Sequence, residues 1–422
     1  MLLRSRRFAP LFVTQFLGAF NDNLYKNALV LLVLFQGFGA VTASGLVVNL
    51  AAAVFILPFF LLSASAGQWV DSTDKTRVAR VAKWLEVFIA GCGAVALLGG
   101  SLALALLALA LLGAQSALFG PVKYGVLPQH LRPDELLAGN AWIEAGTFFA
   151  ILLGTLVAGL LIAAGQGVEL VAALVLVVAL AGVVVVHLMP AAPSAVSSPA
   201  VDLQLLRATC TVLGWARGQA LWRPLLGISW FWAFGATVLT QLPLLVREQL
   251  AGDAAVVSSL LAVFTCGVGV GSWLAAAVLK RDPHAPVVAA AALDMGLLTG
   301  VLVWLAAMVP EGLPLRGPVA FWSDPLTFGI GVCLFGLAAA GGAYCVPLYT
   351  AVQRLAPEQR RGQAIAANNI VNSAAMVLAA LTGMLVFAVG GTVGQLLALA
   401  ALLNLPVAWW VWRRRPERTA AL

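Results

Sequence analysis

Charged side chains are scarce in this chain. Only 10% of its 422 residues are Asp, Glu, Lys or Arg, whereas 62% are hydrophobic. The mean hydropathy is +0.99. A soluble protein of this length cannot bury so much apolar surface in its cores. The composition therefore excludes a soluble protein and predicts a chain that crosses a membrane many times.

Cysteine and histidine are also rare, with five Cys and three His residues in the whole sequence. The cysteines are scattered and show neither a metal-binding spacing nor a disulfide framework. The histidines, His130, His187 and His284, are too far apart in sequence to indicate a cluster. The sequence also has no phosphate-binding glycine loop. We therefore expect no metal, no cofactor and no enzyme activity.

The apolar residues form runs of roughly 18–25 residues, which suit helices that cross a bilayer. These runs are rich in Leu, Ala and Gly and lack the alternation of a transmembrane strand. Twelve runs are separated by charged and Pro- or Gly-rich breaks, which predicts an all-α polytopic membrane protein with twelve transmembrane helices. The expected spans are residues 9–36, 45–66, 77–99, 101–121, 138–164, 168–189, 223–246, 254–280, 285–309, 325–351, 362–389 and 392–412.

One long segment of mixed composition, Pro190 to Leu221, interrupts the series of spans. It begins with a Pro- and Ser-rich linker, and Val201–Leu221 has the pattern of an amphipathic helix at the membrane surface. Six spans precede the segment and six follow it. We therefore predict two six-helix halves, residues 1–189 and 222–422, joined by a cytoplasmic linker at residues 190–221.

The positive charges are unevenly distributed. Most of the 24 Lys and Arg residues fall at the amino end, in alternate connections between spans, and at the carboxyl end. Positive residues in short loops are typical of the cytoplasmic side. Both termini are therefore predicted to be cytoplasmic, which agrees with an even number of spans. The net charge of +7 then reflects orientation in the membrane, and we expect no nucleic-acid partner.

The first predicted span carries charge near its middle. Asp22 lies within the apolar run from Phe8 to Phe35, beside Asn23. A carboxylate at mid-membrane depth costs roughly 2.5–3.5 kcal/mol on insertion scales. Lys26 lies four residues further on, so its side chain shares a helix face with Asp22. Two interpretations stay open: the pair lines a transport path, or it is a structural ion pair that cancels buried charge.

Further polar groups lie in the first half. Lys123 and Tyr124 follow Gly120-Pro121 at the end of the fourth span, and Glu144 lies in the fifth. Lys83 and Glu86, three residues apart, are expected nearer the cytoplasmic end of the third span, where Lys83 can extend toward water. The candidate substrate-binding residues are Asp22, Asn23, Lys26, Lys123, Tyr124 and Glu144.

A motif in the connection between spans two and three resembles the G-x-x-x-D-x-x-x-[RK]-x-R loop of major facilitator transporters. Gly67, Asp71, Lys75 and Arg77 occupy the matching positions, and Asp74 replaces the usual second Gly. In that family the loop helps to close the cytoplasmic gate. A Gly allows two helices to approach, and an Asp at a helix end can pair in one state only. These four residues are the candidate gating residues, and a solvated turn is the alternative.

Several stretches together resemble the bacterial lysophospholipid transporter family. They are Thr14–Asn23, Gly120–Leu127, and Asn140–Ala145 with Ile151–Gly154. The permease domain of fused lysophospholipid acyltransferase proteins has the same pattern. The resemblance implies the major facilitator fold, with two parallel repeats.

The same resemblance implies a function: flipping of lysophosphatidylethanolamine-type lipids by alternating access. These lipids would move across the bacterial inner membrane to the cytoplasmic leaflet, where a separate acyltransferase re-acylates them. The other expected contacts are membrane lipids. The charged first half would suit the head group, and the apolar, aromatic second half would suit the acyl tail.

Two rival functions stay open from the sequence. One is a proton-coupled drug or solute exporter, with Asp22 or Glu144 as the proton carrier. The other is a membrane scaffold that moves nothing and holds an acyltransferase. Transport that depends on a pH gradient favours the first, and an inert reconstituted chain favours the second.

Overall fold

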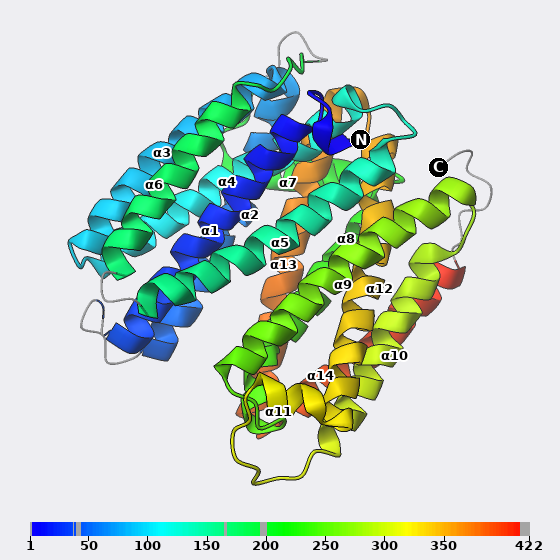
Figure 1. Cartoon of the computed structure of the whole chain (residues 1–422). Helices are drawn as coiled ribbons and strands as arrows, with labels where there is room; N and C mark the ends of the chain where they lie inside the picture. The colour runs from blue at the N-terminus through cyan, green and yellow to red at the C-terminus, as the bar shows by residue number, and fades with distance from the viewer. Residues whose placement is uncertain (1, 37, 39–43, 164–166, 195–200, 414–422) are drawn as a thin grey trace. The chain divides into compact units, whose positions relative to one another are not determined.

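The computed structural model describes residues 2–36, 38, 44–163, 167–194 and 201–413 (Figure 1). Within these ranges the regular structure is helical, apart from a single β-bridge between Gly252 and Arg316. This confirms the predicted all-α class.

Each predicted span corresponds to one long helix. The long helices of the described ranges are α1 (Ala9–Gln36), α2 (Ser44–Ser72), α3 (Lys75–Leu98), α4 (Leu102–His130), α5 (Leu136–Ala163), α6 (Gly167–Val186), α8 (Trp222–Glu248), α9 (Ala254–Arg281), α10 (Val287–Ala307), α12 (Pro325–Leu355), α13 (Arg361–Ala388) and α14 (Val393–Arg413). The shorter helices are α7 (Leu205–Arg217) and α11 (Pro318–Ser323), with 3₁₀ turns at Leu2–Arg4 and Glu358–Arg360.

Eleven helices in the described part of the chain are long and apolar enough to cross a membrane. Helix α1 is not among them, although its 28 residues are sufficient in length. The polar residues Asn21, Asp22, Asn23 and Lys26 lower the mean hydropathy of its central part. The chain is thus a multi-pass membrane protein whose first long helix is unusually polar.

The extensions beyond the predicted ends are longest in α2, α4 and α12, and the one in α2 changes the position of a motif. Helix α2 continues to Ser72, so Gly67 and Asp71 lie on its last turns. The prediction that they lie in a loop is wrong. The connection to α3 consists only of Thr73 and Asp74. Asp74 caps α3, because its side chain accepts a hydrogen bond from the Arg77 N–H.

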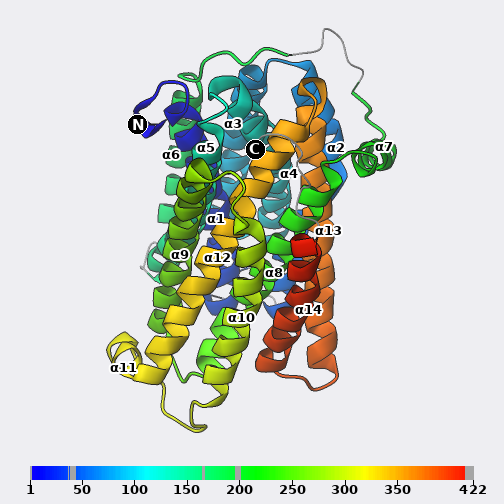
Figure 2. The same ribbon diagram turned by 90° about the vertical axis from the view of Figure 1, so that its right-hand side faces the viewer.

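The predicted amphipathic helix is present but shorter than expected. Helix α7 lies beside α2 (Figure 2). Asp202, which precedes α7, forms hydrogen bonds to α2. The Ser65 hydroxyl donates to the Asp202 carbonyl at 2.7 Å, and the Asp202 N–H donates to Gln68 Oε1 at 2.8 Å. These bonds hold the end of the linker against α2.

The described chain forms two compact units. Unit 1 comprises Met1–Gly139, Phe149–Leu225 and Val352–Ser373, and unit 2 comprises Asn140–Phe148, Leu226–Ala351 and Ala374–Leu422. The predicted halves at residues 1–189 and 222–422 stay a prediction.

In unit 1, α3 packs against α4 and α6, α1 packs against α6, and α2 packs against α4 (Figure 1). Small residues permit large side chains to fit between these helices. A Cβ atom at Gly93 would lie 2.8 Å from the Tyr25 ring. The Tyr25 hydroxyl crosses to α4 and donates to the Ala105 carbonyl at 3.2 Å. Close packing of this kind holds membrane helices together in the absence of a hydrophobic driving force.

In unit 2, α10 packs along α14 (Figure 2). Glycines of α9 lie against the backbone of α12. A Cβ atom at Gly271 would overlap the backbone of Ala339. In contrast, a Cβ at Gly269 would lie 3.7 Å from the Ala145 Cβ, an ordinary contact.

We expect Gly271→Ala to destabilise the protein, whereas Gly269→Ala, two residues away on the same helix, serves as the matched control. Overpacking of this kind costs about 1–3 kcal/mol. The measurement is the melting temperature of the purified protein in detergent. Equal melting temperatures for the two variants would contradict the close approach of α9 to α12.

Candidate functional site

Asp22 is buried in unit 1, with 6% of its surface exposed. The Ser116 hydroxyl of α4 donates to Asp22 Oδ2 at 2.5 Å, and Asp22 Oδ1 has no hydrogen-bond partner. The Lys26 ammonium instead donates to Asn23 Oδ1 at 3.1 Å and lies 5.6 Å from the centre of the Phe55 ring. Among the described residues, Asp22 and Lys26 are not in direct contact as an ion pair, although their charges attract each other.

A second buried polar group lies beside Asp22. The Lys83 ammonium contacts Glu86 Oε2 at 2.5 Å, with 1% and 0% of the two side chains exposed. Asn21 Nδ2 donates to Glu86 Oε1 at 3.2 Å, and Gln115 Nε2 donates to Glu86 Oε2 at 3.3 Å. Lys83 therefore does not extend toward water, which was an alternative left open by the sequence. Sequence reasoning noted this pair but missed Gln115 and Ser116, which are neutral residues in an apolar run.

The remaining candidate substrate-binding residues lie further away or in the other unit. Lys123 is seven residues beyond Ser116 on α4, about 10 Å along the helix axis. Its ammonium lies 4.8 Å from the centre of the Tyr124 ring. Glu144 belongs to unit 2, where it is 1% exposed and interacts electrostatically with Cys345. The structure thus brings Asp22, Asn23 and Lys26 together in unit 1, whereas Glu144 belongs to unit 2.

The predicted gating residue Asp71 binds the start of α13, within unit 1. Its Oδ1 accepts a hydrogen bond from the Gly362 N–H at 2.6 Å, and its Oδ2 accepts one from the Gln363 N–H at 3.0 Å. Free N–H groups at a helix N-terminus attract anions. A Cβ at Gly67 would lie 2.7 Å from the Gly362 carbonyl oxygen, so Gly67 permits α2 to come this close.

The two basic residues of the motif differ from each other. Lys75 is 1% exposed, its ammonium has no hydrogen-bond partner, and it is attracted electrostatically to Asp71. The side chain of Arg77 is exposed, and only its backbone N–H takes part, at the Asp74 cap. Gly67, Asp71 and Lys75 therefore meet at one place and Arg77 does not. Sequence reasoning missed the N–H donors of Gly362 and Gln363, for which the only signal was a predicted helix start.

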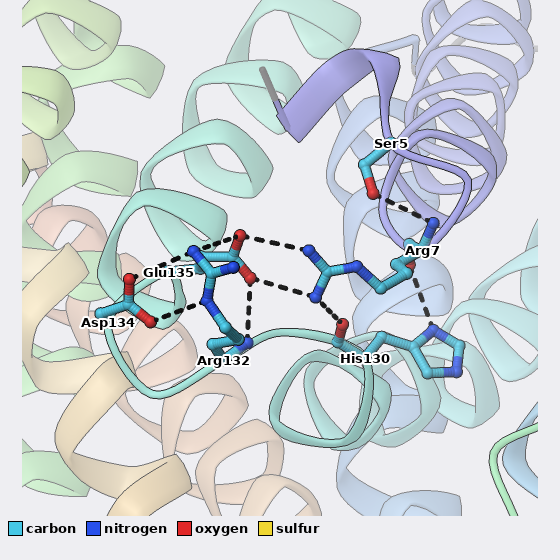
Figure 3. Close-up of polar contacts among 6 residues, drawn as sticks. All are labelled: Ser5, Arg7, His130, Arg132, Asp134 and Glu135. Carbon is cyan, nitrogen blue, oxygen red and sulfur yellow. Dashed lines mark hydrogen bonds and ion pairs between the residues drawn. The ribbon is translucent and has the colours of Figure 1, made fainter.

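A polar network joins the start of α1 to the connection between α4 and α5 (Figure 3). The Arg7 guanidinium donates to both carboxylate oxygens of Glu135, each at 3.2 Å, and to the His130 carbonyl at 3.0 Å. The Arg132 N–H donates to Glu135 Oε2 at 3.0 Å. These hydrogen bonds, first the one from the Arg132 backbone and then those from Arg7, hold the pKa of Glu135 below its ordinary value.

We expect Glu135→Gln to lower the melting temperature at neutral pH, and the loss to shrink under acidic conditions. A depressed pKa means that the ionised group contributes stability above its ordinary pKa of about 4.3 and loses it as the pH falls through the lower value. Asp134→Asn is the control, because Asp134 pairs only with exposed Arg132 among the interactions drawn in Figure 3. The same loss at neutral and strongly acidic pH would contradict this assignment.

Comparison with known proteins supports a single family. The sequence model described as Major Facilitator Superfamily matches residues 11–380. The lysophospholipid transporter LplT of Escherichia coli O157:H7 (strain EC4115 / EHEC) is 30% identical over 429 residues, which cover 98% of this chain and 97% of the relative. The protein of the same name from Shigella flexneri serotype 5b (strain 8401) is 29% identical over 428 residues, with the same coverage of 98% and 97%.

Solved structures share the fold. The human organic anion transporter MFSD10 (TETRAN) has a TM-score of 0.73 at 16% identity, over 96% of this chain and 99% of that one. A bacterial homologue of the iron transporter ferroportin has a TM-score of 0.71 at 17% identity, over 97% of this chain and 100% of that one. The family match, the long relatives and the helical architecture agree, and the chain belongs to the Major Facilitator Superfamily.

Proposed function

We propose that this protein moves lysophospholipids across the bacterial inner membrane to the cytoplasmic leaflet by alternating access. The observation that carries the proposal is the relative named lysophospholipid transporter, which is 30% identical over 98% of this chain. Such a match along the full set of helices supports the same class of substrate. Lysophosphatidylethanolamine-type lipids are the proposed substrates, and a separate acyltransferase is the proposed consumer of the product.

The polar residues of unit 1 suit a zwitterionic head group. The ammonium groups of Lys26 and Lys123 are compact positive charges that can bind a phosphate. Asp22 Oδ1, which has no hydrogen-bond partner, can accept a hydrogen bond from an ammonium. Both signs of charge are therefore available within α1 and α4.

Unit 2 offers apolar surface for an acyl tail. A groove of about 480 Å³ runs between α10 and α14. Its lining contains no charged residue among the described positions and consists of Gly296, Leu297, Gly300, Val301, Val303, Trp304, Ala398, Ala401, Leu402 and Leu405. A tail that leaves the lipid for such a surface loses little free energy, because both surroundings are apolar.

The contact between Asp71 and the start of α13 is proposed to hold one conformation of the transport cycle. Two charge-assisted hydrogen bonds are strong when they are made and are lost when the helices separate. The positive-inside distribution of Lys and Arg supports cytoplasmic termini, and with them a cytoplasmic position for this contact.

The experiment that tests the function is lysolipid flipping in proteoliposomes that contain only this chain, with and without a proton gradient. Accelerated movement of lysophosphatidylethanolamine is the expected result. A chain that moves nothing would favour the scaffold, and gradient-driven movement of unrelated drugs alone would favour the exporter.

We expect Asp22→Asn to slow lysolipid movement by about tenfold or more, because a hydrogen bond to a charged group contributes about 1.5–3 kcal/mol. Asp294→Asn is the matched control, since Asp294 also lies in a long helix but its side chain is exposed. Flip rates should be compared at equal amounts of folded protein. An Asp22→Asn variant as fast as Asp294→Asn would remove Asp22 from the substrate path.

We expect Asp71→Asn to open the contact between α2 and α13. The readout is a single cysteine placed at Ala366, which is buried beside Gly67, in a background without the native cysteines. Losing charge-assisted hydrogen bonds should raise labelling by a membrane-impermeant maleimide by about tenfold. Asp74→Asn, which removes a nearby charge but keeps an oxygen that can cap α3, should leave labelling unchanged. Equal labelling of both variants would count against a gating role for Asp71.

A further inference from the structure

Asp22 is a buried carboxylate, and the two lysines that act on it, Lys83 and Lys26, are both engaged with other partners. Lys83 is enclosed by two glycines: a Cβ at Gly182 would lie 2.7 Å from Lys83 Cε, and a Cβ at Gly18 would lie 3.1 Å from Lys83 Nζ. This enclosure holds the ammonium against Glu86 at 2.5 Å. Lys83 therefore neutralises Glu86, and no ammonium among the described residues is paired directly with Asp22.

Among the residues that the structure describes, the other surroundings of Asp22 supply no replacement cation. Besides Glu86 and Lys83, the charge that acts on Asp22 is Lys26, whose ammonium donates to Asn23. Helix α4 contributes the neutral Ser116 and Gln115. Helix α5 contacts α1 through Gly154 and Thr155, α6 contributes Gly182 beside Lys83, and α2 contributes Phe55, all uncharged.

The hydrogen atoms of the cluster can be counted. The Ser116 hydroxyl carries one hydrogen, yet it lies 2.5 Å from Asp22 Oδ2 and 3.3 Å from Gln115 Oε1, and both are acceptors when Asp22 is ionised. If Asp22 carries a proton on Oδ2, it donates to Ser116, and Ser116 is then able to donate to Gln115. Gln115 in turn donates to Glu86. Each contact in this series of hydrogen bonds, from Asp22 to Glu86, then has its own hydrogen atom.

We propose that Asp22 is a binding site for one proton, and that the chain Ser116–Gln115–Glu86 stabilises the neutral carboxyl. The carboxylate takes a proton from water and becomes a carboxylic acid, with no other reactant. Burial favours this form, because an ionised carboxylate without a paired cation is costly in a medium that lacks water. The site differs from Asp71, whose carboxylate is held by two N–H donors.

Infrared spectroscopy of the full chain in lipid, with ¹³C-carboxyl aspartate or glutamate, tests the site without any transport. We expect a protonated carboxyl band that shifts on aspartate labelling and persists at about pH 6, where exposed aspartates with a pKa near 3.9 are ionised. The band should be lost in Asp22→Asn, weakened in Glu86→Gln, where the Lys83 ammonium loses its partner, and retained in Asp294→Asn. If a variant fails to fold, the shift of the band on aspartate labelling of the unsubstituted protein still tests the proposal.

Three results would overturn the proposal. The first is the absence of an aspartate-sensitive band at about pH 6. The second is a band that is lost in Asp294→Asn but retained in Asp22→Asn. The third is its removal by sodium at constant pH, with choline as the control, which would make Asp22 a sodium ligand.

A consequence rests on the proposed function, because one carboxylate cannot hold a proton and a head-group ammonium together. Lysophosphatidylethanolamine should reduce the band, whereas lysophosphatidylglycerol, which has no ammonium, should not. A band that neither lipid changes would contradict the placement of the head group at Asp22 and support a proton site that stands apart from it. A reduction by both lipids equally would contradict the competition between proton and ammonium.

Discussion

The structure depends on how charged groups are satisfied where water is absent. Glu86 is paired with Lys83 and receives hydrogen bonds from Asn21 and Gln115. Asp71 is held by two backbone N–H groups at the start of α13. Each arrangement offsets the cost of burying charge, and each joins helices that are distant in sequence. Asp22 has a single hydroxyl partner, which makes it the group of unit 1 best suited to exchange one ligand for another.

The sequence was sufficient for the helices because the length of an apolar run determines whether it can span a bilayer. Helix α1 begins and ends where it was predicted, at Ala9 and Gln36. Helix α2 extended into its motif, since nothing between Gly67 and Ser72 breaks a helix. The partners of the charged residues were less predictable. Asp71 meets Gly362 across most of the chain, and no local pattern records such a pair.

The charged and apolar features are distributed in a way that suits an amphiphilic substrate. Unit 1 contains Asp22 and Lys26 on one helix, and unit 2 contains the apolar groove between α10 and α14. Membership in the Major Facilitator Superfamily gives the fold, which carries many substrates and does not by itself define one. The proposal of a lysolipid therefore depends on the named relatives together with these side chains.

The most direct measurement of the central claim, that unit 1 receives the charged head group, is photo-crosslinking with a lysolipid that carries its reactive group on the head. The account predicts adducts mainly on α1, α3 and α4, near Asp22 and Lys26, and a tail-labelled probe should give adducts on α10 and α14. Head-group adducts that map mainly to α8–α14 would contradict the account, even if lysolipid transport were observed.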